Sequence, residues 1–262
     1  METLSTIRTE RRDRVLLVTI DNPRSDLNAV DHELHHDLTA LFGALRKESE
    51  AGAVVLTGHG RAFSAGGDFN WFPELQDPDR LEALRRDAKQ MIWDLLDVEV
   101  PLVAAVNGPA IGLGASIALL CDAVFMADSA TLADPHVRVG LVAGDGGAVI
   151  WPLAVGPARA KRYLLTGDPL TAEEAERIGL ATHVVPAARL LDDALAFAGR
   201  LADGAPLAVR YTKMAVNKLV KDALNVAFDA STALELLTFK SDDHREALAA
   251  LREKRAPKFS GR

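Results

Sequence analysis

Two glycine-rich turns contain the residue types in this chain that could do chemistry. The first turn, residues 58–69, reads GHGRAFSAGGDF and directly follows the apolar run 53–57. The second, residues 107–114, reads NGPAIGLG and follows the apolar run 102–106. Glycine lets the backbone turn tightly after a strand and present N–H groups that no side chain covers. Two such turns predict a pair of N–H donors that could stabilise negative charge developing on a carbonyl oxygen.

The elements around these turns are predicted to alternate between strands and helices. Such alternation is typical of a largely parallel sheet with right-handed crossovers, and hence of an α/β fold. The second half of the chain reads mostly helical, and Thr171 followed by Glu174 is a capping-box start for one helix. Residues 190–255 contain three helical stretches, so we expect an α/β core over residues 1–186 and a helical module over residues 187–262. The apolar patterns predict strands at residues 14–20, 53–57, 102–106 and 123–127, and helices at residues 31–47 and 80–96.

The turns resemble the signature segments of the crotonase superfamily, which is also called the enoyl-CoA hydratase/isomerase family. Residues 62–68 match its Ala-Phe-x-Ala-Gly-x-Asp loop. Residues 107–122 match its Asn-Gly-x-Ala-x-Gly-x-Gly turn and the helix that ends near Cys-Asp. The resemblance runs from residues 22–29 to residues 254–259 and covers nearly the whole chain. It implies a crotonase-like α/β core of repeated ββα units in a spiral. It also implies a C-terminal helical trimerisation module, and hence a homotrimer or a dimer of trimers.

The resemblance also implies how the chain would bind a substrate. Gly67 and Leu113 take the positions that supply two backbone N–H donors, an oxyanion hole, to a thioester oxygen. A helix beginning near Gly112 would direct its positive end at the same oxygen. Coenzyme A would enter as part of an acyl-CoA substrate, and no permanently bound cofactor or metal is expected. The positions that the resemblance places along the substrate are Asn28, Ala29, Ala65, Gly66, Asp68, Phe69, Asn70, Gly112, Lys258 and Phe259.

The side chains expected to do the chemistry depart from the family pattern. Hydratases of the family hold a water molecule between two glutamates. This chain has Ser116 at the first position and His136, directly after Pro135, at the second. A hydroxyl is a poor base at neutral pH, so Ser116 could position water but also fits a packing role in a buried helix. Imidazole titrates near neutral pH, so His136 is predicted to act as the general base.

A second acid–base candidate, Asp145, lies in the glycine-rich turn 144–147. A carboxylate there could hydrogen-bond His136, fix its tautomer and raise its basicity. A His–Asp pair at this separation resembles the crotonase-fold β-diketone hydrolases, which cleave a carbon–carbon bond by a reverse Claisen reaction and need no coenzyme A. Asp145 also suits a cap of the helix predicted to begin near residue 147, and both roles can hold together.

These observations lead to two functional hypotheses. The first is an enoyl-CoA hydratase/isomerase family enzyme that acts on an acyl-CoA thioester through an enolate-stabilising oxyanion hole, with His136 in place of the usual glutamate base. The alternative is a hydrolase that cleaves a C–C bond of β-diketones with His136 and Asp145. The aromatic residues Phe69, Trp71 and Phe72 could then line a hydrophobic substrate pocket. A non-catalytic acyl-CoA-binding protein ranks last, because a titratable residue replaces the missing glutamate.

Composition narrows the remaining possibilities. The formal charge of −7 gives no support for binding nucleic acid or an anionic membrane. Residues 101–121 carry no charge, but Asn-Gly-Pro and two further glycines interrupt them. That pattern predicts a strand, a turn and a buried helix rather than a membrane span. Cys121 is the only cysteine and the first residues show no secretory signal, so a cytoplasmic protein is expected.

Other polar residues give weaker signals. His32, His35 and His36 fall in one predicted helix, and no second cluster of ligands completes a metal site, so a solvated helix face is expected. Asp68 is expected to order its loop. Glu235 lies in a C-terminal helix and could reach a site in a closed trimer, although nothing local in the sequence supports that role.

Overall fold

The computed structural model describes residues 4–262 and contains two β-sheets. The strands of the larger sheet are β1 (Ile7–Arg12), β2 (Val15–Ile20), β3 (Ala53–Gly58), β4 (Leu102–Val106), β6 (Ala123–Ala127) and β9 (His183–Val185). They lie in the order β1-β2-β3-β4-β6-β9, and all neighbours are parallel except the β1–β2 pair. The smaller sheet consists of β5 (Ala110–Ile111), β7 (Thr131–Ala133) and β8 (Leu170–Thr171). The largely parallel large sheet confirms the α/β prediction.

Apolar sequence explains the central strands of the large sheet. Every residue of β4 is buried, and in β3 only the final glycine is partly exposed. A parallel strand that is covered on both faces needs such a continuous apolar run, and the sequence therefore predicts both strands. In β1 only Ile7 is buried and the other residues, which include three arginines, are exposed. This charged strand suits a sheet edge, and its lack of an apolar pattern explains why the sequence does not predict it.

Helices cover the sheets, and side chains cap the first turn of several of them. Asp31 caps α1 (His32–Leu45) by accepting a hydrogen bond from the Leu34 N–H at 2.9 Å. Thr171 caps α6 (Ala172–Ile178) by accepting from the Glu174 N–H at 3.3 Å, which confirms the capping position read from the sequence. The other α-helices are α2 (Pro78–Asp97), α3 (Leu113–Leu119), α4 (Gly147–Val155), α5 (Pro157–Thr166), α7 (Leu190–Ala202), α8 (Pro206–Phe239) and α9 (Asp242–Glu253). Short 3₁₀ helices are η1 (Phe72–Gln76), η2 (His136–Val139) and η3 (Ala187–Arg189).

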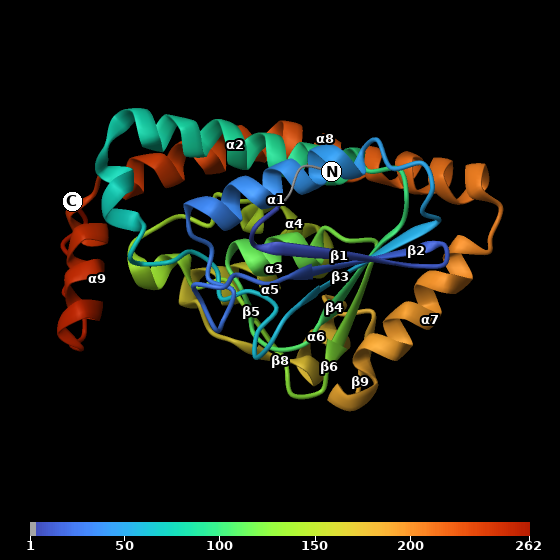
Figure 1. The fold of residues 1–262 in the computed structure, drawn as a ribbon. Helices are drawn as coiled ribbons and strands as arrows, with labels where there is room; N and C mark the ends of the chain where they lie inside the picture. The colour runs from blue at the N-terminus through green and yellow to red at the C-terminus, as the bar shows by residue number, and fades with distance from the viewer. Residues whose placement is uncertain (1–3) are drawn as a thin grey trace.

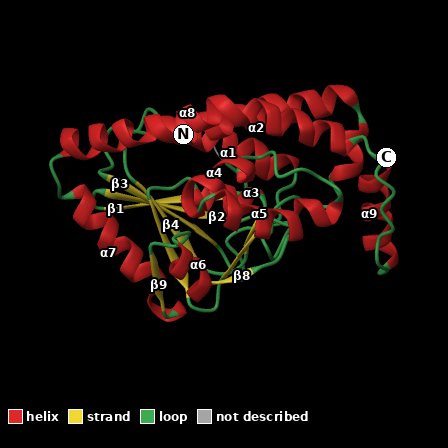
Figure 2. Cartoon of the chain, turned by 180° about the vertical axis from the view of Figure 1, so that it is seen from behind, coloured by secondary structure: helices red, strands yellow, loops and turns green. Residues whose placement is uncertain are grey.

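The long helices α2 and α8 lie side by side along one side of the molecule, as both ribbon views show (Figure 1, Figure 2). α8 also contacts α4, whereas α7 packs against β3 and β4. The helices α7, α8 and α9 are the three helical stretches predicted beyond residue 190. Among residues 4–262, no helix is both long enough and apolar enough to span a bilayer. Because α8 packs against α4, a side chain from this C-terminal helix can reach residues at the ends of the strands.

Candidate active site

The two glycine-rich turns lie side by side because β3 and β4 are neighbouring parallel strands. The Ile111 N–H donates to the Ser64 carbonyl at 2.9 Å, and Ser64 also forms an isolated bridge with Ala110. Glycine is required where the turns touch, since a Cβ on Gly114 would stand 2.7 Å from the Ser64 carbonyl oxygen. A Cβ on Gly66, whose φ is +76°, would stand 2.8 Å from the Ile111 carbonyl oxygen. The two turns therefore form one continuous wall.

Each turn leaves one backbone N–H without an acceptor. The Val30 N–H donates to the Gly66 carbonyl at 2.7 Å. The Asp68 N–H donates to the Val30 carbonyl at 2.9 Å, which leaves the Gly67 N–H between these two bonds. The Leu113 N–H is the first of α3, where helix geometry supplies no acceptor. Within residues 4–262 neither the Gly67 nor the Leu113 N–H has a hydrogen-bond partner, and both residues line one cavity of about 80 Å³.

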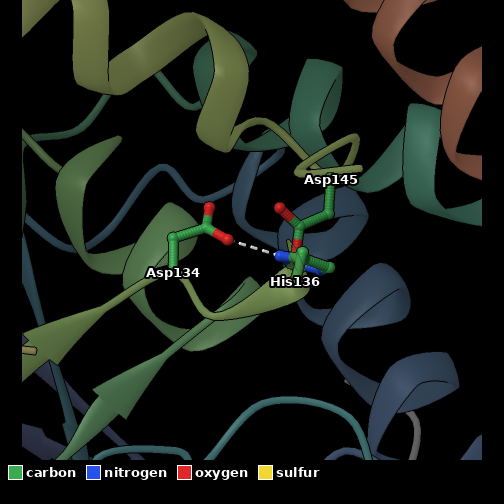
Figure 3. Close-up of side chains that lie close together, drawn as sticks. All are labelled: Asp134, His136 and Asp145. Atoms are coloured by element: carbon green, nitrogen blue, oxygen red, sulfur yellow. Dashed lines mark hydrogen bonds and ion pairs between the residues drawn. The ribbon is translucent and has the colours of Figure 1, made fainter. Parts of the chain in front are cut away.

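His136 lines the same cavity and is held from one side by Asp134. Its Nδ1 lies 2.5 Å from Asp134 Oδ1 (Figure 3). Asp134 directly follows β7 and is only 1 % exposed, so its carboxylate is a fixed, buried acceptor that orients the imidazole and favours a proton on Nδ1. Nε2 is then the nitrogen that is free to gain or lose a proton. Asp134 is not among the sequence candidates, and its place two residues before His136 at a strand end is the signal that could have found it.

Two further carboxylates stand near Nε2 of His136. Asp145 Oδ2 lies 3.5 Å from Nε2 and Glu235 Oε1 lies 3.8 Å from it. Figure 3 shows Asp134 and Asp145 approaching the imidazole from different directions. Ser116 is fully buried, and its Oγ donates to Asp145 Oδ1 at 3.0 Å, so the hydroxyl positions a carboxylate. The predicted neighbourhood of His136 and Asp145 is present, but the tautomer-fixing hydrogen bond expected from Asp145 comes from Asp134 instead.

Glu235 reaches the site from α8, far along the chain from the other site residues. Gly144 makes room for it, since a Cβ at this position would collide with the Glu235 side chain. Thr232, one turn earlier in α8, fixes the approach by donating from Oγ1 to the Gly144 carbonyl at 3.1 Å. Glu235 therefore reaches His136 within a single chain and needs no partner subunit. The sequence carries no local signal for this contact, because only the packing of α8 on α4 creates it.

Burial and neighbouring charges set the protonation of this cluster. Burial alone would lower the pKa of His136, but the three nearby carboxylates outweigh it and hold that pKa well above its ordinary value. Burial raises the pKa of Asp145, and the Asp134 carboxylate adds to this while His136 and Ser116 oppose it. Burial likewise raises the pKa of Glu235 to about 8, although His136 opposes this shift. At neutral pH the cluster therefore holds an imidazolium beside a protonated Glu235.

The imidazole borders a second cavity of about 70 Å³. This cavity and the first share walls made by Gly67, Phe72, His136 and Leu141. The structure thus brings part of the predicted substrate positions to His136, and Phe72 lines both spaces. Predicted substrate positions that line the second cavity are Ala65, Gly66, Phe69 and Gly112.

The remaining predicted substrate positions have other contacts. The Asn28 side chain is buried, and its amide donates to two carbonyls of the first glycine-rich turn at 3.0 Å each, so it orders that turn. Asp68 Oδ1 accepts a hydrogen bond from the Asn70 N–H at 2.8 Å, which confirms the loop-ordering role expected of Asp68. Lys258 and Phe259 are partly or largely exposed near the C-terminus and line none of the cavities described above.

Two sequence predictions are wrong. His35 is only 5 % exposed, whereas His32 and His36 are exposed, so the three histidines do not form one solvated face. The reason is that α1 packs against α2, which buries the side of α1 that carries His35. Asp145 also does not occupy the cap of α4. The N-cap position belongs to Gly146, whose φ is +119° and which has no side chain, although a hydrogen bond from the Gly147 N–H at the start of α4 lowers the pKa of the Asp145 carboxyl.

The side chains of Asp134, His136 and Asp145 also offer ligand atoms that lie within 4.8 Å of one another. A divalent cation would have to take Nδ1 or Nε2 of the imidazole. Nδ1 is already bonded to Asp134 at 2.5 Å, and the adjoining Gly67 and Leu113 donors suit a negatively charged oxygen rather than a cation. An acid–base role therefore accounts for these side chains better than a metal site does.

The fold and the cavity define an α/β enzyme in which free backbone donors adjoin a buried acid–base group. The profile of the enoyl-CoA hydratase/isomerase family matches residues 10–262. The chain belongs to this family, the crotonase superfamily, as its glycine-rich turns predict.

Relatives and solved structures agree over nearly the full length. The chain is 33 % identical over 260 residues to a 2,3-dehydroadipyl-CoA hydratase of Escherichia coli, covering 99 % of this chain and 100 % of the relative. A crystal structure of an enoyl-CoA hydratase/isomerase from Mycobacterium paratuberculosis is 37 % identical with a TM-score of 0.90, covering 95 % and 99 % of the two chains. A β-diketone hydrolase from the cyanobacterium Anabaena is 30 % identical with a TM-score of 0.84, covering 89 % and 94 %. These likenesses confirm the predicted crotonase-like fold.

Proposed function

We propose that this enzyme acts on an acyl-CoA thioester and stabilises an enolate of that thioester. The observation that carries the proposal is the pair of free N–H groups of Gly67 and Leu113 in the cavity that contains His136. The thioester oxygen would accept from both donors, and the first turn of α3 adds its partial positive charge. One such donor contributes on the order of 3 kcal/mol to transition-state stabilisation.

In this proposal His136 moves the proton through Nε2, while Asp134 holds Nδ1. The neutral imidazole acts as the base, taking a proton from the substrate or from water. Because the nearby carboxylates raise the pKa of His136, the neutral imidazole becomes abundant only at a higher pH than in an ordinary histidine, so activity should rise with pH. The acid form of Glu235, whose pKa is about 8, can return a proton to the enolate. Since residue 116 is serine and residue 136 is histidine, we expect slower hydration of short 2-enoyl-CoA thioesters than a two-glutamate enzyme achieves.

Coenzyme A enters this proposal only as part of the substrate. The name of the Escherichia coli relative, a CoA-thioester hydratase, supports the substrate class. Binding of the nucleotide by Lys258 and Phe259 would require the C-terminal segment of this or a neighbouring subunit. We also propose a homotrimer or a dimer of trimers, because α8 exposes apolar side chains such as Leu219 and Val226 that a subunit interface would cover.

A second candidate function is hydrolysis of a carbon–carbon bond in a β-diketone. The contacts of His136 Nε2 with Asp145 at 3.5 Å and Glu235 at 3.8 Å favour it, as does the structural likeness to the Anabaena β-diketone hydrolase. Among residues 4–262, no lysine or arginine lines the second cavity, where the phosphates of coenzyme A would find no cationic partner.

The hydrolytic step would use the same residues. His136 takes a proton from water, and the hydroxide adds to one carbonyl carbon. The bond between this carbon and the carbon shared by the two carbonyls then breaks, and its electron pair forms an enolate held by the Gly67 and Leu113 N–H groups. A proton from Glu235 or Asp145 reaches the enolate carbon, which yields a ketone and a carboxylic acid.

One experiment separates the two candidates. A panel of 2-enoyl-CoA thioesters and CoA-free cyclic β-diketones is incubated with the enzyme and with His136→Ala, and products are identified by mass. Addition of water to the thioesters, or isomerisation seen as a shifted double bond, supports the acyl-CoA proposal if His136→Ala loses it. Ring-opened diketone with unchanged thioesters supports hydrolysis instead. Asp145→Asn should then remove most of the hydrolytic activity.

A further inference from the structure

We call the first cavity, which contains His136 and the Gly67 and Leu113 N–H groups, the catalytic cavity. A much larger cavity adjoins it. It has a volume of about 460 Å³ and lies between α1 and the segment formed by η1 and the start of α2. Its lining and that of the catalytic cavity share His35, Trp71, Leu75 and Leu84. These four residues therefore form a common wall, which we call the shared wall.

The catalytic cavity is too small to hold a substrate by itself. Its volume of about 80 Å³ corresponds to roughly three water molecules, each of which occupies about 30 Å³ in the liquid. Pockets for small molecules typically enclose about 300–1,000 Å³. The cavity beyond the shared wall has this size, so the part of a substrate that does not react can extend into it when side chains of the shared wall move.

His35 is the polar residue of the shared wall that lacks a partner. It is 5 % exposed, and its Nε2 has no hydrogen bond within residues 4–262. Its ring packs against Trp71, with the two centroids 5.7 Å apart. An unpaired buried polar group costs about 1–3 kcal/mol, and leucine, which stands at the neighbouring buried positions Leu34 and Leu38, would avoid this cost. Nε2 is itself inaccessible to solvent, so a ligand can reach it only when side chains of the shared wall move, and such a ligand would supply the partner that packing does not.

The chemistry of His35 restricts what it can bind. Burial lowers the pKa of His35 to about 4, and the neighbouring His32 and His36 contribute to this shift. The imidazole is therefore neutral at physiological pH and can donate or accept one hydrogen bond through Nε2. A neutral ring gives a carboxylate no charge partner. Arg80, which lines the large cavity, is already paired with Glu74, and Asp87 would repel a carboxylate.

We propose that His35 is a specificity-determining residue that hydrogen-bonds an uncharged oxygen, a carbonyl or hydroxyl, on the part of the substrate remote from the reacting carbonyl. This inference rests on the proposed function, because it concerns the substrate of the same site. It predicts that the preferred substrate carries a second oxygen function, and that its remote end lies past Trp71 in the larger cavity.

The test measures binding separately from turnover, in a His136→Ala background. The probes are a medium-chain 2-enoyl-CoA and keto derivatives in which the second carbonyl moves one carbon at a time, together with a cyclic β-diketone and the matching monoketone. Calorimetry gives the dissociation constants of three proteins: His136→Ala with His35 intact, and the same protein with His35→Gln or His35→Leu added. We expect the best keto compound to bind about tenfold more tightly than its parent when His35 is present, one hydrogen bond's worth. His35→Leu should abolish this preference, and His35→Gln should retain part of it.

Two results would overturn the inference. One is a preference that survives unchanged in His35→Leu, and the other is the absence of any preference in both probe pairs. Melting temperatures add an independent readout, because His35→Leu should raise stability if the imidazole has no internal partner. A drop in stability with unchanged binding would mean that His35 serves packing. The proposed function fails separately, namely if turnover of both substrate classes is unaffected by His136→Ala.

Discussion

His136 and His35 line the same cavity, yet their surroundings drive them to opposite charge states. Around His136, burial disfavours the imidazolium, but three carboxylates outweigh it and raise the pKa well above the ordinary value. Around His35, burial acts without any carboxylate and lowers the pKa to about 4, with nearby histidines adding to the shift. The comparison shows that burial alone does not decide the charge of a histidine. The charged groups buried beside the histidine decide whether it is protonated.

The same contrast separates two kinds of task. A histidine surrounded by acids can exchange protons with them, which suits acid–base chemistry at His136. A buried histidine without neighbouring acids stays uncharged over the physiological pH range, which suits recognition of an uncharged group by His35. Four substitutions break or sharpen this comparison, and we describe them from the largest expected effect to the smallest.

Replacement of His136 by alanine should have the largest effect. Loss of a general base typically lowers the rate about 10²- to 10⁴-fold, so kcat of His136→Ala should fall within that range. His183→Ala is the matched control, since His183 is exposed and lines neither the catalytic cavity nor the larger cavity beside it. Steady-state kinetics of the three proteins check the prediction. Equal rates for wild type and His136→Ala would remove His136 from the chemistry.

Gly112→Ala should disturb His136 without changing any titratable group. Gly112 has a φ of +53°, and a Cβ there would stand 3.3 Å from Cε1 of His136. We expect a loss of about 1–3 kcal/mol in the free energy of unfolding from backbone strain. Displacement of the imidazole should lower kcat about tenfold to a hundredfold. Gly199→Ala in α7 is the control, because a Cβ there meets no atom within 4 Å. If both variants behave alike, Gly112 has no special role beside His136.

Glu235→Gln should remove one proposed proton donor to the enolate and shift the pH dependence of the enzyme. It removes one of the carboxylates that raise the pKa of His136, so the rise of activity with pH should begin at a lower pH. The folded state binds the Glu235 proton up to a pKa of about 8, whereas an unfolded glutamate releases it near about 4.3. Stability should therefore fall as the pH rises through this window, and less steeply in Glu235→Gln.

Two titrations check this prediction. NMR titration of the imidazole C–H signals gives the pKa of His136 and of His35, and denaturant unfolding at several pH values gives the stability slope. The pKa of His35 should not change in Glu235→Gln, because Glu235 is not among the groups that shift it. An unchanged pKa of His136 would contradict the assigned electrostatics.

Ser116→Ala should have the smallest effect. The Ser116 hydroxyl donates to Asp145 Oδ1 and lowers the pKa of that carboxyl, opposing the effect of burial. Its loss should raise the pKa of Asp145 further and cost about 1 kcal/mol, less than a tenfold change in kcat. Steady-state kinetics across pH detect the shift. A loss as large as that of His136→Ala would instead give Ser116 a direct part in the reaction.

The sequence predicts well where local pattern determines structure. The central strands follow from continuous apolar runs, and the two predicted glycine-rich turns directly follow β3 and β4. Prediction from the sequence fails for β1, whose charged residues give no apolar pattern. It also fails for His35, because α2 buries the face of α1 that carries this residue. The division of the chain at residue 186 stays a prediction. The helix α7, which lies beyond that residue, packs against strands β3 and β4 of the core.

By itself the sequence determined the family, the two glycine-rich turns and the presence of His136 where a glutamate is expected, because these features depend on residues close together in the chain. Only the tertiary structure decided which acids surround that histidine. Asp134 lies two residues away but acts through its orientation, and Glu235 comes from a distant helix packed over the sheets. Charge and burial act through space, so the protonation of His136 and of His35 is a property of the packed molecule.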